Sequence, residues 1–111
     1  MKTFKTTATL LLLLASPVSY SLVTGNELVE YCKSNDRGIY WGMCRGYIYG
    51  VYDRQYWVED SKFESCPPDG VTIEQMTSVV RKYLTDRPEK LHSAASALVT
   101  VGISLAWPCS D

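Results

Sequence analysis

The stretch RGIYWGMCRGYIYGVYDRQYWV, residues 37–58, decides the fold of this chain. At helical spacing it is apolar or aromatic nearly all round, which is typical of a helix buried at the centre of a bundle. Three glycines recur in it at every fourth position, Gly42, Gly46 and Gly50, and each costs a helix about 1 kcal/mol relative to alanine. The sequence therefore predicts a buried central helix whose glycines let a second helix approach closely.

A second stripe of small residues, near the C-terminus, offers a partner for these glycines. Ala95, Val99, Gly102 and Ala106 recur at three-to-four spacing within a helix predicted over roughly residues 88–107, with an irregularity expected near His92. We predict that this stripe packs against the three glycines. Ordinary core packing without that pairing is the alternative.

Residues 1–21 have the features of a secretory signal peptide. A short basic start precedes the apolar run ATLLLLLA, and Ser19-Tyr20-Ser21 is an acceptable cleavage site. The run is less than half of the roughly 20 apolar residues that a membrane span needs. We expect cleavage after Ser21, a single exported domain of residues 22–111, and no membrane anchor after cleavage.

The mature chain is acidic. Removal of Lys2 and Lys5 leaves 9 basic and 12 acidic residues, a net charge of −3. Proteins that bind nucleic acids or anionic membranes need a basic patch. The charge therefore argues against both kinds of ligand and suits a basic partner.

Four cysteines, all in the mature region, predict two disulfides and an oxidising compartment. A zinc site is the weaker alternative, because no two cysteines have the spacing of a zinc knuckle and His92 is the single histidine. Four cysteines allow three pairings. An up-and-down trace of helices favours Cys32 with Cys44 and Cys66 with Cys109.

Two capping boxes mark helix starts. Thr24 is followed three residues later by Glu27, and Thr72 is followed by Gln75. Two prolines and a glycine make residues 66–70 a loop. Because no segment alternates convincingly at period two, the sequence predicts an all-α fold, a compact bundle of about four helices braced by two disulfides.

Residues that could perform catalysis are scarce. A hydrolase needs a nucleophile, a base and a group that orients the base, and His92 lies on a predicted helix among alanines. Paired cysteines leave no free thiol as a nucleophile. We therefore expect no enzymatic activity, no catalytic residue, no metal site and no cofactor.

Aromatic residues are more numerous than a core of this size readily hides, with eight tyrosines and three tryptophans. Both types are favoured at protein interfaces, because one end is apolar and the other can form hydrogen bonds. Tyr49, Tyr52, Tyr56 and Trp57 are therefore candidates for a surface that binds a partner or forms a homodimer. Packing in the core with ordinary partial exposure is the alternative.

An ordered set of motifs resembles a known family. The set comprises Gly-Asn-Glu-Leu at 25–28 leading to a cysteine, Cys-Arg-Gly-Tyr-Ile at 44–48, Cys-Pro-Pro-Asp-Gly-Val-Thr at 66–72, Val-Val-Arg-Lys-Tyr-Leu at 79–84, and Trp-Pro-Cys at 107–109. Together these motifs are similar to those of the Rap/Tai family of immunity proteins of bacterial type VI secretion systems. The resemblance covers nearly all of residues 25–109.

The resemblance implies a small, periplasmic, all-helical protein without enzymatic activity. It further implies binding to a cognate effector, a peptidoglycan-cleaving amidase, whose substrate groove the immunity protein occludes. The matching residues are largely structural, so the motifs assign no contact surface.

Exposed connections of a rigid scaffold are where contacts with a partner are expected. The candidate residues lie in the loop before the third predicted helix, in the turn after it, and in the aromatic half of the central helix: Pro67, Pro68, Asp69; Asp86, Arg87, Glu89; Tyr52, Tyr56 and Trp57. A second function also stays open, that of an acid-stress chaperone of the periplasmic HdeA type. Such a protein would expose apolar surface when carboxylates such as Asp53 are protonated.

Overall fold

The structure is a computed structural model that describes residues 22–34, 37–57 and 65–110. These ranges contain the helices α2 (Gly25–Cys32), α3 (Ile39–Trp57), α4 (Ile73–Asp86) and α5 (Ala95–Ala106), and the 3-10 helix η1 (Pro88–Lys90). Instead of strands they hold two isolated bridges, Thr24 with Ala94 and Ser65 with Pro108. The predicted all-α class with about four helices is confirmed. The predicted signal peptide lies outside the described residues, and none of the described helices is long and apolar enough to span a membrane.

Both predicted capping boxes are present. The Glu27 carboxylate accepts a hydrogen bond from the Thr24 backbone N–H at 2.9 Å, and the Gln75 Oε1 accepts one from the Thr72 N–H at 2.8 Å. Each threonine hydroxyl in turn accepts from the backbone N–H of the box's second residue. These local bonds fix where α2 and α4 begin.

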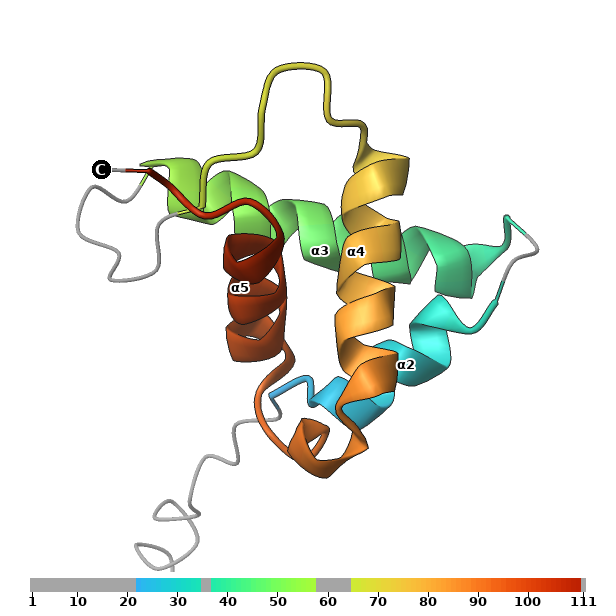
Figure 1. Cartoon of the computed structure of the whole chain (residues 1–111). Coiled ribbons are helices and arrows are strands. Elements are labelled where there is room, and N and C mark those ends of the chain that lie inside the picture. Colours follow the sequence, from blue (N-terminus) through green and yellow to red (C-terminus); the bar gives the residue numbers. More distant parts are fainter. Residues whose placement is uncertain (1–21, 35–36, 58–64, 111) are drawn as a thin grey trace, which may run out of the picture.

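The longest helix, α3, lies across the other helices rather than alongside them. Figure 1 shows α4 and α5 running side by side in opposite directions, with α3 crossing behind both. Helix α2 contacts all three of the others. The short connection from α4 to α5 therefore gives the antiparallel neighbours that were expected, while α3 serves as a platform.

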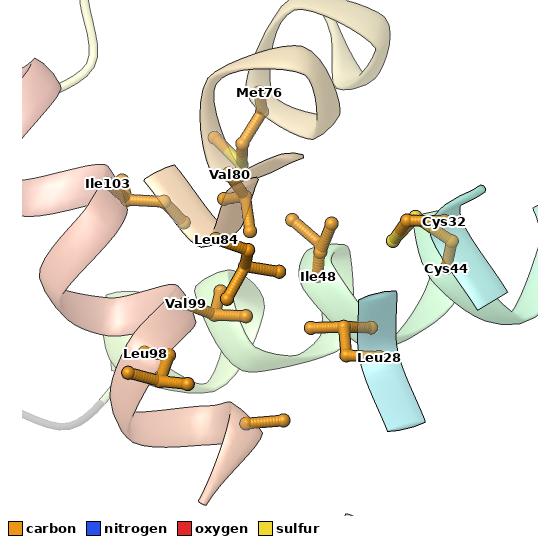
Figure 2. Close-up of a cluster of buried hydrophobic side chains, with 11 residues drawn as sticks. Leu28, Cys32, Cys44, Ile48, Met76, Val80, Leu84, Leu98, Val99 and Ile103 are labelled. Atoms are coloured by element: carbon orange, nitrogen blue, oxygen red, sulfur yellow. A yellow bond between two sulfur atoms is a disulfide. The ribbon is translucent and has the colours of Figure 1, made fainter. Parts of the chain in front are cut away.

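The core forms where all four helices meet (Figure 2). Leu28 from α2, Ile48 from α3, Leu84 from α4 and Val99 from α5 are each almost completely buried and point toward one another. The other buried apolar side chains complete this cluster: Cys32, Cys44, Met76, Val80, Ala95, Leu98 and Ile103.

The two predicted disulfides are both present. Cys32 is bonded to Cys44, and the pair lies at the edge of the core between α2 and α3. Cys66 is bonded to Cys109, which closes a loop of 43 residues and joins the chain before α4 to the chain after α5.

The last predicted helix is interrupted around His92, where an irregularity was expected, and its continuous part, α5, is shorter than the predicted span of roughly 88–107. A 3-10 turn at Pro88–Lys90 is followed by an irregular segment, and α5 begins at Ala95. The Leu91 and Ser93 carbonyls accept hydrogen bonds from Asn26 and Gly25, both at 2.9 Å, and the Ala95 N–H donates to the Val23 carbonyl. The backbone groups of this segment thus pair with the start of α2, and the helix is interrupted there.

The predicted packing of Gly42, Gly46 and Gly50 is wrong. All three are exposed, and a methyl group added to any of them would have no neighbour within 4 Å in the described structure. Helix α3 is covered on one side only, where Cys44 and Ile48 are buried. The other α-helices that the structure describes, α2, α4 and α5, pack on that side of α3.

The small-residue stripe of α5 packs elsewhere. Ala95, Val99 and Gly102 are buried, as expected of core residues, whereas Ala106 is exposed. A methyl group on Gly102 would lie 3.2–3.3 Å from the side chain of Tyr83 on α4. The close approach at this glycine is therefore between α5 and α4, and the alternative of ordinary core packing is correct.

Replacing Gly46 by alanine is expected to raise the free energy of unfolding by about 0.5–1 kcal/mol, because alanine stabilises a helix interior and nothing opposes the new methyl group. The matched change Gly25→Ala should lower it by about 1–3 kcal/mol, because that methyl group would lie 2.5 Å from Leu98 Cδ1 and 2.9 Å from the Leu91 carbonyl oxygen. Urea denaturation measures both values. If Gly46→Ala instead lowered the free energy of unfolding, the result would support the close helix packing against Gly46 that the sequence predicted.

Candidate functional site

A cleft lies between the second half of α3 and the loop that precedes α4. Its volume is about 240 Å³. Ten residues line it: Tyr49, Tyr52, Pro67, Pro68, Asp69, Gly70, Val71, Thr72, Ile73 and Met76. We call it the α3–loop cleft.

Two tyrosines three residues apart on α3 form one wall of the cleft. A spacing of three places side chains on the same side of a helix. Tyr52 is partly buried and packs against the core, whereas Tyr49 is 55% exposed. Tyr52 is therefore held in place, and Tyr49 presents most of its ring to solvent.

The opposite wall is the loop from Cys66 to Gly70, which Figure 1 shows as an arch between the end of α3 and the start of α4. The Val71 N–H donates to the Pro68 carbonyl at 3.3 Å, and Gly70 has a φ of 95°. A turn with positive φ at its third position requires glycine or a similarly tolerant residue. This turn puts Asp69 at the exposed tip of the loop.

Two links anchor this loop to the C-terminal segment. One is the disulfide from Cys66 to Cys109. The other is a hydrogen bond from the Cys66 N–H to the Trp107 carbonyl at 2.8 Å. The first turn of α4 completes the lining of the cleft. There Thr72 caps the helix and Met76 is buried in the core. A disulfide, two prolines and a helix cap thus restrain the wall.

Charged and aromatic contacts join α3 to α4 next to the cleft. Arg45 forms an ion pair with Glu74. The guanidinium carbons of Arg45 and Arg81 lie 6.0 and 5.5 Å from the centre of the Trp41 ring. These contacts hold α4 against α3. The Arg45–Glu74 pair carries no net charge.

The structure brings together one group of predicted contact residues and separates the other. Tyr52, Pro67, Pro68 and Asp69 meet in the α3–loop cleft. Tyr56, one turn further along α3, is exposed but does not line it. The side chain of Trp57 lies outside the described residues.

The second predicted group lies at the opposite end of α4 (Figure 1). Asp86 pairs with Lys82 at 2.6 Å, the Arg87 guanidinium lies 4.8 Å from the centre of the Tyr83 ring, and Glu89 is exposed in η1. Asp86 and Arg87 therefore have partners within the chain, and a partner protein is not needed to explain them.

Sequence reasoning missed the cleft residues that follow the loop, namely Val71, Thr72, Ile73 and Met76. The capping box at Thr72 was a usable signal, because it places the first turn of α4 directly after the loop.

Among the residues that the structure describes, no three His, Cys, Asp or Glu side chains gather closely enough to hold a metal ion.

Comparison with known proteins assigns the family. A model of the Rap1a immunity proteins matches residues 24–109, which span every described helix. The chain belongs to the Rap1a immunity protein family. As a Rap1a-family protein, it has the role of an immunity protein, whose partner is a cognate effector. A search of the curated proteins returned no match.

Proposed function

We propose that this Rap1a-family protein is a periplasmic inhibitor that binds a peptidoglycan amidase effector of a type VI secretion system and blocks its substrate groove. The family match over residues 24–109 is the observation that carries this proposal. The predicted signal peptide and the two disulfides support an oxidising compartment outside the cytoplasm.

The α3–loop cleft supplies a contact surface suited to this role. Stable complexes are centred on a few residues in well-packed pockets, and tyrosine is enriched among them. The cleft combines two tyrosines with a wall held by the Cys66–Cys109 disulfide. A restrained wall loses little conformational freedom on binding, which favours affinity.

The direct test uses a peptidoglycan amidase effector, sought among the neighbouring genes and by pull-down with the mature protein. The mature immunity protein is titrated into the amidase at neutral pH, and peptide release from purified peptidoglycan is measured. We expect activity to fall to zero at an equimolar ratio, with a dissociation constant of about 1 nM or tighter, as for enzyme inhibitors of this kind. Sedimentation of the unbound protein tests the predicted homodimer.

Full amidase activity in the presence of a tenfold excess of the immunity protein would contradict the proposal. The acid-stress alternative predicts a different result, namely suppressed aggregation of unrelated proteins near pH 2–3 and not at pH 7. A protein from outside the family with a similar net charge serves as the control in both assays.

A further inference from the structure

Within the described structure, the loop wall of the α3–loop cleft offers free hydrogen-bond acceptors as well as free donors, the N–H groups of Asp69, Gly70 and Ile73. Pro67 and Pro68 have no N–H, and three other N–H groups of the loop are already used: Cys66 donates to Trp107, Val71 to Pro68, and Thr72 to Gln75. The carbonyls of Pro67, Asp69 and Gly70 accept no hydrogen bond from any described residue. A ligand with several N–H donors can bond to these three carbonyls.

The charge at the cleft is negative. Asp69 is the single charged residue among the ten that line it, it is exposed, and within the described chain it forms no salt bridge. Asp53, one turn beyond Tyr49 on α3, and the adjacent Arg54 are both exposed, so together they add no net charge to this part of the helix. Arg45, one turn before Tyr49, is neutralised by Glu74.

The start of α4 adds a partial positive charge beside the cleft. The capping box occupies the N–H groups of Thr72 and Gln75, and Glu74 in the first turn is paired with Arg45. The full charge of the Asp69 carboxylate exceeds the roughly half charge of a helix terminus, so the cleft keeps a negative charge.

The two tyrosine rings complete a site for a guanidinium group. Arginine stacks on aromatic rings and has five N–H donors and no acceptor. The protein already uses this contact internally, with Arg87 on Tyr83 and with Arg81 on Trp41. A volume of about 240 Å³ suits one side chain, since sites for whole small molecules are usually about 300–1,000 Å³.

We propose that the α3–loop cleft binds an arginine side chain of the effector, with its guanidinium stacked on Tyr49 and bonded to Asp69 and the loop carbonyls. The proposal rests on the proposed function for the identity of the partner. The chemistry of the cleft is independent of it, and the two can be tested separately.

The first experiment needs no effector. The mature protein, labelled with ¹⁵N, is titrated with N-acetyl-arginine-N-methylamide and with the citrulline analogue, which is neutral and nearly the same shape. We expect saturable shifts of the Asp69, Gly70 and Val71 amides with a millimolar dissociation constant for arginine. The citrulline analogue should bind the wild-type protein about three- to fivefold more weakly than the arginine analogue does, the size expected for one exposed ion pair. The Asp69→Asn variant should bind the arginine analogue more weakly by the same factor.

Glu89→Gln is the matched control, because it removes one negative charge at the far end of α4 and should leave the titration unchanged. Equal binding of arginine and citrulline, or shifts spread away from the cleft, would overturn the proposal whether or not the protein inhibits an amidase.

The second experiment uses the effector complex. Tyr49→Leu and Asp69→Asn should each weaken effector binding about tenfold, because a buried anchor side chain loses its stacking or its charge partner. Tyr40→Leu is the control: Tyr40 is 56% exposed on the same helix, stacks on Tyr31 and does not line the cleft. Tight binding by all three variants would reject the arginine site and leave the proposed function intact. An effector that the wild-type protein fails to bind would reject the function, while the arginine titration still decides the chemistry of the cleft.

Discussion

Replacing Leu28 with alanine is expected to lower the free energy of unfolding by about 2–5 kcal/mol. Leu28 is completely buried where α2 meets the other three helices, beside Ile48 and Leu84. The lost transfer energy and the cavity left behind both contribute to the loss. Because small domains are stable by only about 5–15 kcal/mol, this single change removes a large share of the total. Urea denaturation followed by circular dichroism measures it.

Leu105→Ala is the matched control. Leu105 lies in α5 and is 60% exposed, so its truncation should change the free energy of unfolding by no more than about 0.5 kcal/mol. Similar losses for the two variants would mean that the four helices do not share the core seen in Figure 2.

Removing the Cys66–Cys109 disulfide, by changing both residues to alanine, is expected to lower the free energy of unfolding by up to about 4 kcal/mol. The bond closes a loop of 43 residues, and the entropy regained by the unfolded chain grows with the length of the closed loop. The same change removes the covalent link between the wall of the α3–loop cleft and the C-terminal segment. The backbone hydrogen bond from residue 66 to the Trp107 carbonyl remains. We therefore expect effector binding to weaken about tenfold or more, since ordering each freed residue costs about 1–2 kcal/mol.

The double alanine variant of Cys32 and Cys44 separates stability from binding. Its loop of 12 residues gives about 3 kcal/mol in the same chain-entropy model, and truncating the buried cystine adds a packing loss. The Cys32–Cys44 bond lies away from the cleft. At a temperature where the variant is folded, the dissociation constant of its effector complex should therefore stay within about twofold of wild type. A tenfold change would correspond to about 1.4 kcal/mol. Equal loss of binding in the two variants would show that the Cys66–Cys109 bond has no particular role at the cleft.

Local signals in the sequence predicted much of the fold correctly. The capping boxes at Thr24 and Thr72 depend on side chains three residues away, so they can be recognised without the tertiary structure. The disulfide pairing followed from the positions of the cysteines relative to the helix ends. The candidate site was half predicted, because Pro67, Pro68, Asp69 and Tyr52 were named but not known to meet.

The errors have a common cause. Apolar residues all round α3 suggested burial on every side, yet Ile39, Met43 and Tyr49 are exposed. Helical periodicity predicts which residues share a face, and it does not tell how many faces have a neighbour. The break before α5 likewise depends on hydrogen bonds from Gly25 and Asn26, more than 60 residues away in the chain.

The sequence by itself determined the helical class, both helix caps and the two disulfides of this immunity protein, because each depends on local spacing or on the few ways that four cysteines can pair. The tertiary structure decided which side of α3 is covered, where the last helix begins, and that Tyr49 faces the loop at Asp69 across one cleft. These features depend on contacts between residues distant in the chain, and such contacts are set by the packing of whole helices rather than by any local pattern.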